Sequence, residues 1–234
     1  MRRRASEMRF KLRIEAVQWA IIGAMFVLAA VMWPSAPDQI PANWGLSGEP
    51  SRYGGKFEGL LLLPLITLSV YLLMLVLPKL DPRRDNYALF EGAYAVIRVS
   101  VVVFQALIYG FILLWVRGVE LDVTVVVPVL VGGLLVVLGN LLGKVRPNWF
   151  VGIKTPWTLS SRRSWVKTHR MAGWTFVLLG LAFVCLGLAN PAWALPALVA
   201  ATVGSLLWLV VYSYLVWRSD PERGPETDAP EVGR

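Results

Sequence analysis

Few residues of this chain are of the types that carry out catalysis. Its single histidine, His169, and its single cysteine, Cys185, are separated by an apolar run, which excludes a zinc site between them and an intramolecular disulfide. Serines lie near His169, but that stretch has no carboxylate to orient the imidazole as a general base. A Gly-x-x-x-x-Gly-Lys-Ser/Thr phosphate loop is also missing. We therefore expect a protein that is not an enzyme, with no catalytic residues, no cofactor and no metal.

Residues suited to binding gather first between Pro34 and Lys56. Glycines and prolines favour turns there, and the aromatic side chains suit either the headgroup layer of a membrane or a contact with another molecule. Two interpretations stay open, an ordered interfacial loop and a recognition surface for a molecule outside the cell. The candidate binding residues are Asn43, Trp44, Gly48, Glu49, Arg52, Tyr53 and Lys56.

A second such stretch runs from Gly143 to Ala172. Pro147 and Pro156 interrupt any helix, and Gly152 allows a tight bend. A basic helix over residues 162–171 should follow and lie in the inner membrane interface. The candidate binding residues are Lys144, Arg146, Pro147, Asn148, Gly152, Lys154, Thr155, Pro156, Trp157, Thr158, Trp165, His169 and Arg170.

Several side chains of this inner stretch are of types that cap helices or bind backbone groups. Ser160 or Ser161 can cap the basic helix, and Asn148 can satisfy free backbone N–H and C=O groups. Trp157 suits a position at the interface between membrane and water. At helical spacing, one face of the basic helix carries Trp165, Thr168, His169 and Ala172, and another carries Arg163, Lys167 and Arg170.

Composition sets the fold class. The chain has 234 residues, of which 56% are hydrophobic and only 16% are charged, and this nearly excludes a soluble globular enzyme. A membrane-spanning helix needs about 20 apolar residues. Six runs qualify, so we predict an all-α polytopic membrane protein with six transmembrane helices, one outer loop and one inner basic interfacial segment. The runs are 17–33, 60–77, 96–116, 123–142, 173–189 and 193–217.

The distribution of basic residues predicts the orientation. If both termini are cytoplasmic, nearly all of the 23 Lys and Arg residues lie inside. Only Arg52, Lys56 and Arg117 lie outside, and Arg98 falls at the inner end of the third span, where it should snorkel to the headgroups. We expect a multi-pass protein of a bacterial cell membrane, whose basic segments contact the lipid bilayer.

Small residues predict how the helices pack. Gly173, Gly180 and Gly187 recur every seven positions and should form a packing seam, and Gly139 with Gly143 makes a second pair of small residues. The spans carry no Asp, Glu or His near mid-membrane, which disfavours proton- or ion-coupled transport.

The two binding stretches carry a family resemblance. The inner motifs are similar to the signature of the SdpI family of bacterial immunity membrane proteins, and the outer motifs resemble an N-terminal module of unknown function that accompanies it. The inner motifs are Gly139-Asn140, Lys144-Val-Arg-Pro-Asn148, Gly152-Ile-Lys-Thr-Pro-Trp-Thr-Leu159, Trp165 and Lys167-Thr-His-Arg170. The outer motifs are Ile40-Pro-Ala-Asn-Trp44, Gly48-Glu-Pro50 and Tyr53-Gly-Gly-Lys56.

Three positions depart from the family pattern. The family commonly has His at the position of Asn43 and Asp at that of Ser51, so an ion or proton role of that pair is not carried over to this chain. It more often has Arg at the position of Lys154, and lysine preserves the charge but not the bidentate geometry.

The resemblance implies that the chain is divided into two modules. Residues 1–90 would form the N-terminal module with two spans and the outer loop, and residues 91–218 the SdpI-like module with four spans. Residues 219–234 are rich in proline and poor in apolar residues, which predicts a disordered tail.

The family also implies a function. The resemblance implies protection of a bacterium against a secreted membrane-active toxic peptide and, as in the founding system, holding a small autorepressor at the membrane when toxin is present. Partners would then be the lipid bilayer, a toxic peptide outside and a repressor protein inside, with no direct nucleic-acid binding. The alternatives are a small transporter or exporter of a peptide or lipid and, third, a membrane-embedded enzyme.

Overall fold

The computed structural model describes residues 2–221, and their side chains from residue 13 onward. The described residues are all-α, as the sequence predicts, apart from one small antiparallel sheet that lies in the predicted outer loop. Most of the predicted disordered tail, residues 222–234, lies outside the described residues. The elements are α1 (Arg2–Met32), β1 (Ile40–Trp44), β2 (Pro50–Gly54), the π-helix η1 (Phe57–Leu61), α2 (Leu62–Leu80), the 3₁₀ helix η2 (Arg84–Phe90), α3 (Glu91–Val116), α4 (Val123–Leu142), α5 (Pro156–Leu159), α6 (Arg162–Ala189) and α7 (Ala194–Arg218).

Within the described residues, six helices are long and apolar enough to cross a membrane. They correspond to the six predicted runs, and α4 has the predicted bounds. Many large apolar side chains lie on the surface of the bundle, for example Leu207 at 62% exposure and Trp208 at 46% on α7. Such a surface is unfavourable in water but suits lipid tails.

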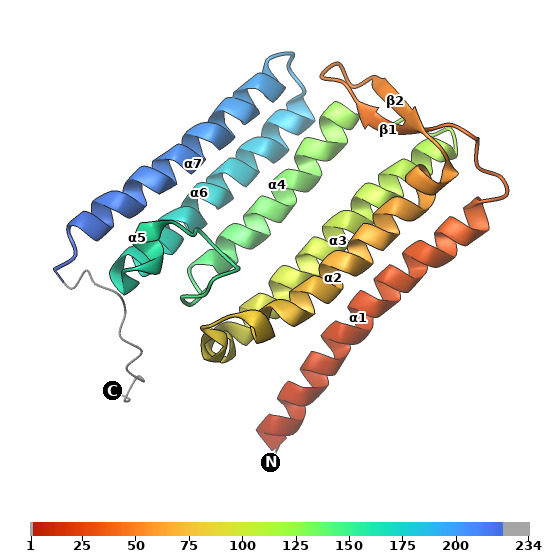
Figure 1. Ribbon diagram of the computed structural model, residues 1–234. Coiled ribbons are helices and arrows are strands. Elements are labelled where there is room, and N and C mark those ends of the chain that lie inside the picture. The colour runs from red at the N-terminus through yellow and green to blue at the C-terminus, as the bar shows by residue number, and fades with distance from the viewer. Residues whose placement is uncertain (1, 222–234) are drawn as a thin grey trace.

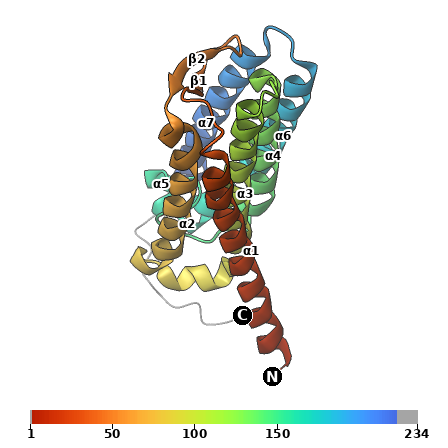
Figure 2. The same ribbon diagram turned by 90° about the vertical axis from the view of Figure 1, so that its right-hand side faces the viewer.

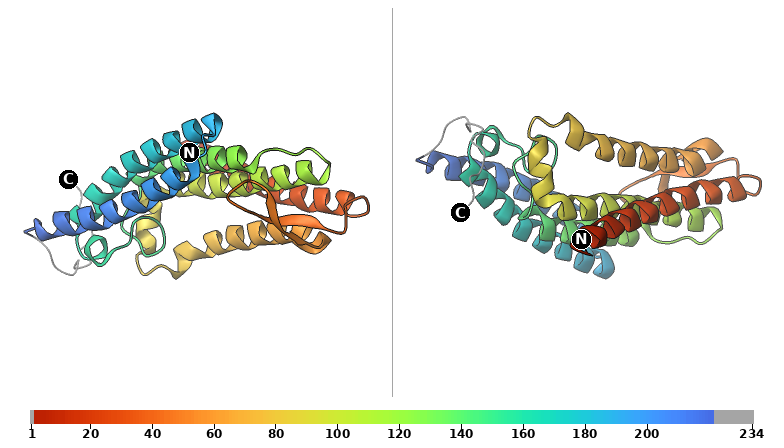
Figure 3. Two further views of the ribbon diagram at one scale, coloured as in Figure 1. Left: turned by 90° about the horizontal axis from the view of Figure 1, so that it is seen from above. Right: turned by 90° about the horizontal axis from the view of Figure 1, so that it is seen from below.

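The connections alternate between two ends of the bundle (Figures 1 and 2). The β1–β2 hairpin and the α3–α4 and α6–α7 connections lie at one end, whereas the start of α1, η2 and α5 lie at the other. We call these the outer and inner ends, after the orientation that the charge distribution predicts. Seen along the bundle, α1, α2 and α3 occupy one side, and α4, α6 and α7 the other (Figure 3).

Glycines bring α4 and α6 into backbone contact. A Cβ on Gly132 would lie 2.6 Å from the Gly180 carbonyl oxygen, and one on Gly139 would lie 2.7 Å from that of Gly173. No side chain fits at these crossings, which confirms the predicted packing seam. The predicted pairing of Gly139 with Gly143 is wrong for Gly143, because a Cβ there would meet nothing within 4 Å.

At the outer end, Asp122 connects the start of α4 to the α6–α7 turn. Its carboxylate accepts the Thr124 N–H at 2.8 Å as the N-cap of α4, and it accepts the Asn190 amide at 3.0 Å. Asn190 ends α6 with a φ of 43°, a left-handed conformation that asparagine tolerates. These contacts align the helical hairpin of α6 and α7 with α4.

The prediction of a separate basic helix in the membrane interface is wrong. Residues 162–171 are instead the first turns of α6, which has 28 residues and is about 42 Å long. No proline or unfavourable run separates the basic turns from the apolar ones, so the helix continues through Gly173. Ser161 caps it, with its hydroxyl accepting the Ser164 N–H at 2.9 Å.

The orientation can be tested at two exposed positions. We expect Ser47→Cys, in the hairpin, to react with a membrane-impermeant maleimide in intact cells, and Lys144→Cys, at the inner end, to react only after permeabilisation. Both variants are made in a Cys185→Ser background, and labelling is followed by a gel shift. Labelling of position 144 in intact cells would contradict the predicted topology.

Candidate functional site

The inner segment, residues 143–161, is organised around the buried side chain of Asn148. Its Oδ1 accepts the N–H groups of Phe150 and Val151 at 2.9 and 2.6 Å. Its Nδ2 donates to the carbonyl oxygens of Arg146 and Val151 at 2.8 and 3.0 Å. One fully buried amide therefore satisfies the backbone of an irregular turn, as the sequence predicts.

Asp81 joins this turn to the end of α2, and the sequence analysis missed it. Its carboxylate accepts the Trp149 N–H at 2.9 Å and the Tyr87 hydroxyl at 3.1 Å, and it is 2% exposed. Asn86 adds a hydrogen bond from its amide to the Pro147 carbonyl at 2.8 Å. The only signal in the sequence was an Asp-Pro pair directly after an apolar run, which usually indicates a turn.

His169 is a structural residue at the other side of the inner segment. Its Nε2 accepts the Ile153 N–H at 3.0 Å, so the proton lies on Nδ1, which donates to the Trp165 carbonyl at 2.9 Å. The ring stacks on Trp165 with centroids 4.0 Å apart. Both nitrogens are used, and the ring is 1% exposed, so it is placed for packing and not for proton transfer.

Gly152 allows the chain to pass over this imidazole. Its φ is +111°, and a Cβ at this position would lie 2.2 Å from His169 Nε2. Glycine is required here for two reasons, the backbone conformation and the space.

The short helix α5 and its N-cap residue contact α7. Thr155 and Thr158 form a capping box, and the Thr155 hydroxyl lies 3.0 Å from that of Ser213 on α7. Trp157 packs edge-on against Tyr214, with centroids 5.2 Å apart. A contact between two hydroxyls and one aromatic pair therefore join α5 to α7.

Burial divides the predicted inner residues into two groups. Pro147, Asn148, Thr155, Thr158, Trp165 and His169 are buried and shape the segment. Gly152 and Trp157 are half-buried. A partner would meet the exposed side chains, which are Lys144, Arg146, Lys154, Pro156 and Arg170, together with Trp149 and Phe150.

The predicted outer loop is a hairpin fixed to the bundle by one face. Ile40 is fully buried among residues of α1, η1 and α3, and Gly59 allows its close approach. Trp44 packs against Phe111 on α3 at a centroid distance of 5.5 Å. The turn at Gly48, with a φ of +85°, lies against the start of α4. The hairpin thus bridges the two sides of the bundle.

The other face of the hairpin is free for contact. Leu46 is 84% exposed and Tyr53 is 49% exposed, and Asn43 and Glu49 are also exposed. Arg52 forms a bidentate ion pair with Glu58, which raises the pKa of its guanidinium. Lys56 lies 3.5 Å from Asp38, so both predicted cations already have acidic neighbours in this chain.

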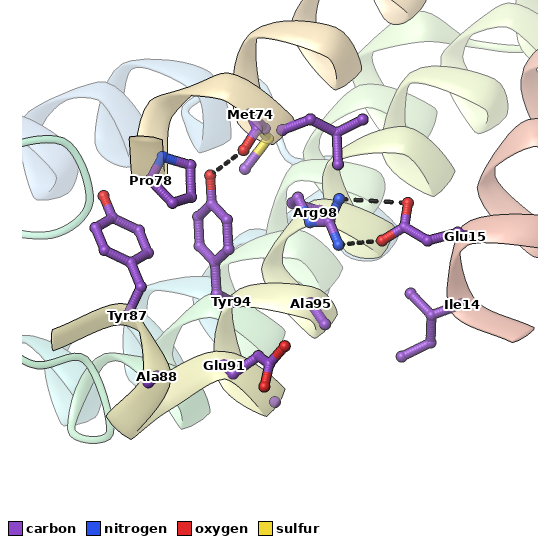
Figure 4. Close-up of a pocket in the computed structure, with 12 residues that line it drawn as sticks. Ile14, Glu15, Met74, Pro78, Tyr87, Ala88, Glu91, Tyr94, Ala95 and Arg98 are labelled. Carbon is purple, nitrogen blue, oxygen red and sulfur yellow. Dashed lines mark hydrogen bonds and ion pairs between the residues drawn. The ribbon is translucent and has the colours of Figure 1, made fainter. Parts of the chain in front are cut away.

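A third site, which the sequence analysis did not predict, lies between α1, α2 and α3 (Figure 4). Glu15 and Arg98 form a bidentate ion pair beside a cavity of about 550 Å³. The hydroxyl of Tyr71 also donates to Glu15, at 2.6 Å. Arg98 was expected to snorkel to the headgroups, but this is wrong: it is 8% exposed, because a carboxylate of α1 meets it inside the bundle.

Residues 144–216 match the SdpI/YfhL protein family, and residues 20–68 match a domain of unknown function, DUF1648. The chain is similar to the immunity protein SdpI of Bacillus subtilis strain 168, with 21% identity over 83% of this chain and 91% of the relative. The chain is SdpI-like. No solved structure matches it.

The two matched regions coincide with the two structured connections. The SdpI/YfhL match begins at the inner segment and ends near the end of α7, so it includes the polar bonds of Asn148 and His169. The DUF1648 match covers α1 from residue 20 onward, the hairpin, η1 and the start of α2. The predicted division into modules at residue 90 is not tested by these matches and stays a prediction.

The tight bend at Gly152 yields a stability test. We expect Gly152→Ala to lower the free energy of unfolding by about 1–3 kcal/mol, because alanine strains the backbone and meets His169. Gly143→Ala is the control, since its φ of −65° and open surroundings accept a methyl group. Thermal unfolding of the detergent-solubilised variants measures the difference. Equal melting temperatures would contradict the role given to Gly152.

Proposed function

We propose that this SdpI-like chain is a membrane immunity protein, without enzymatic activity, that protects a bacterium against a secreted membrane-active peptide. The alignment with the immunity protein SdpI carries this proposal, since it spans 83% of this chain and 91% of the relative. The matches to the DUF1648 and SdpI/YfhL models support it, because they account for both structured connections of the bundle.

The exposed face of the hairpin is the proposed contact surface for the peptide. It presents an apolar side chain at Leu46, an aromatic ring at Tyr53 and an acid at Glu49. An amphipathic or cationic peptide at the bilayer could pack on the first two and pair with the third. Each exposed contact of this kind contributes about 0.5–1 kcal/mol, so several must act together.

The proposed contact surface can be tested by substituting exposed residues of the hairpin that do not attach it to the bundle. We expect the triple variant Leu46→Ser, Glu49→Gln and Tyr53→Ser to lose most of its protection, because it removes the exposed contacts and leaves Ile40 and Trp44 intact. The readout is the membrane potential of a deletion strain that makes each variant and is challenged with culture supernatant of the toxin-producing parent strain.

The control variant changes apolar residues at the same end of the bundle. Val119→Ser with Leu121→Ser lies in the α3–α4 connection, where both side chains are exposed. It should protect as the wild type does at equal expression. Full protection by the hairpin variant would refute the contact-surface part of the proposal, and susceptibility unchanged by deletion of the gene would refute immunity itself.

The exposed side chains of the inner segment are the proposed contact surface for a repressor protein. Trp149 is 49% exposed and Phe150 is 36% exposed, and Lys154 is fixed beside them by a hydrogen bond from Nζ to the Phe150 carbonyl at 2.8 Å. Aromatic side chains beside a cation are typical of protein contact sites. The buried bonds of Asn148 and Asp81 would hold this surface in shape.

If this second surface binds a repressor, substitutions in it should abolish signalling without abolishing protection. We expect Trp149→Ser with Phe150→Ser to abolish toxin-dependent expression from the gene's own promoter, followed with a reporter, while protection persists. Val166→Ser, at an exposed position of α6, is the control and should change neither. Normal reporter induction in the double variant would contradict a role of this surface in signalling.

The alternative is a small transporter or exporter of a peptide or lipid. The spans carry no Asp, Glu or His near mid-membrane, which disfavours ion-coupled transport, and the buried pair of Glu15 and Arg98 lies at the inner ends of α1 and α3. Immunity and export differ in one measurement: an exporter would lower the amount of peptide bound to protected cells, whereas a blocking protein would leave the peptide bound but inactive.

A further inference from the structure

An apolar groove runs along the outer half of the bundle, between α1, α3 and α4. Its volume of about 510 Å³ lies within the range of ligand pockets. The last turns of α1, the second half of α3 and the first turns of α4 line it, so it lies where the two sides of the bundle meet. Apolar residues from each of these helices form its walls, for example Leu28, Phe111 and Leu130.

A single cation lies at the outer end of this groove. Of the residues that line it, only Arg117, the C-cap of α3, has a polar side chain. Arg117 is exposed, and its guanidinium has no ion pair or hydrogen bond among the described residues. The acids that follow it in the chain do not line the groove: Glu120 is exposed, and Asp122 binds Thr124 and Asn190. Arg117 is therefore available to an anionic group of a bound molecule.

The length of the groove matches one leaflet of a bilayer. Along α3 the groove extends from Ala106 to Arg117, which is about 16 Å at the rise of an α-helix. Half of the hydrocarbon core of a membrane measures about 15 Å. Ala106 lies near the middle of α3 and Arg117 at its outer end, so the cation lies at the level of the headgroups and the apolar walls at the level of the acyl chains.

One cation beside otherwise apolar walls fits an amphiphile with an anionic group. We propose that the groove binds a phospholipid of the outer leaflet, with one acyl chain along α3 and the phosphate accepting hydrogen bonds from Arg117. A guanidinium binds phosphate oxygens in a bidentate manner, and the two charges are complementary. Every phospholipid carries this phosphate, so recognition does not depend on the rest of the headgroup.

The bound lipid would join the two sides of the bundle beneath the hairpin. Phe111 of α3 lines the groove and also packs against Trp44 of β1, whereas Leu130 belongs to α4. An acyl chain between these helices contacts both sides, so binding should stabilise the folded state. The two ends of the described chain lie at the inner end of the bundle, away from this groove (Figure 1). The site does not depend on the proposed immunity function.

One pair of variants fills the groove. Gly110 lines it, and a Cβ on Gly110 would meet nothing within 4 Å, so Gly110→Leu would place a side chain in the open space. Gly204→Leu is the matched control, since Gly204 is also helical and open but belongs to α7, outside the groove. Both substitutions favour helix, so neither should prevent folding.

A second pair of variants changes the charge. Arg117→Gln removes the cation of the groove. Arg52→Gln removes the same charge from the hairpin at the same end of the bundle, outside the groove, and is the matched control. A loss of binding that follows Arg117 alone therefore reports a direct contact and not the net charge of the outer end.

Binding is measured by native mass spectrometry of the delipidated full chain in detergent, and stabilisation by the melting temperature. The probes are 1-palmitoyl-2-oleoyl phosphatidylglycerol, the matching diacylglycerol, which lacks the phosphate, and glycerol 3-phosphate, which lacks the acyl chains. We expect one phosphatidylglycerol to bind and to raise the melting temperature of the wild type and of both controls. Arg117→Gln should weaken this binding about tenfold, the size expected of one charge-assisted contact, and Gly110→Leu should lose it.

Four results would overturn the proposal. Equal binding of phosphatidylglycerol by Gly110→Leu and the wild type would place the lipid elsewhere on the bundle. Equal binding of phosphatidylglycerol and diacylglycerol would show that the phosphate is not recognised. Binding of glycerol 3-phosphate as tightly as the lipid would show that the apolar walls contribute nothing. A dimer that Gly110→Leu alone dissociates would show that a second copy of the chain occupies the groove.

Discussion

The close approach of α4 and α6 is the constraint on which the rest of the SdpI-like region depends. Where Gly132 meets Gly180 and Gly139 meets Gly173, the two backbones touch, and no side chain separates them. The same face of α6 continues towards the inner end with Ala172, His169 and Trp165, all of which are buried. Because one unbroken helix carries both the seam and this aromatic pair, the helix crossing also sets where the inner segment must lie.

The irregular backbone of the inner segment is partly buried, so its buried N–H and C=O groups cannot bind water and need partners within the protein. The chain supplies these partners with short polar side chains that bind several backbone groups each. Asn148 satisfies four such bonds, and Asp81 and His169 tie the turn to two different helices. Many of the residues that carry the family resemblance are therefore those that the segment needs in order to fold. The exposed side chains around them are the ones available for a partner.

The N-terminal half of the bundle contains a buried ion pair between Glu15 and Arg98. A buried ion pair gains little net stability, because desolvation offsets most of the attraction between the charges. The pair of Glu15 and Arg98, joined by Tyr71, nevertheless specifies how α1 meets α2 and α3, since only this register brings the three side chains together. It also leaves a polar corner in an otherwise apolar cavity.

The sequence alone determined the features that depend on local composition. Six apolar runs gave six helices, glycines at a spacing of seven gave the seam, and Pro147, Gly152 and Asn148 predicted a turn held by an asparagine side chain. Each of these follows from hydrophobicity, periodicity or the conformational preference of one residue type, all of which can be judged within a single stretch of chain.

Only the tertiary structure decided which side chains meet across distant segments. Glu15 and Arg98 are 83 positions apart, and Asp81 and Trp149 are 68 apart, so no local pattern could pair them. The same holds for burial: on sequence, Asn148, Lys154 and His169 were equivalent candidates for binding, yet two are enclosed and one is exposed. The physical reason is that accessibility and ion pairing depend on the packing of whole helices, which the types of the individual residues do not specify.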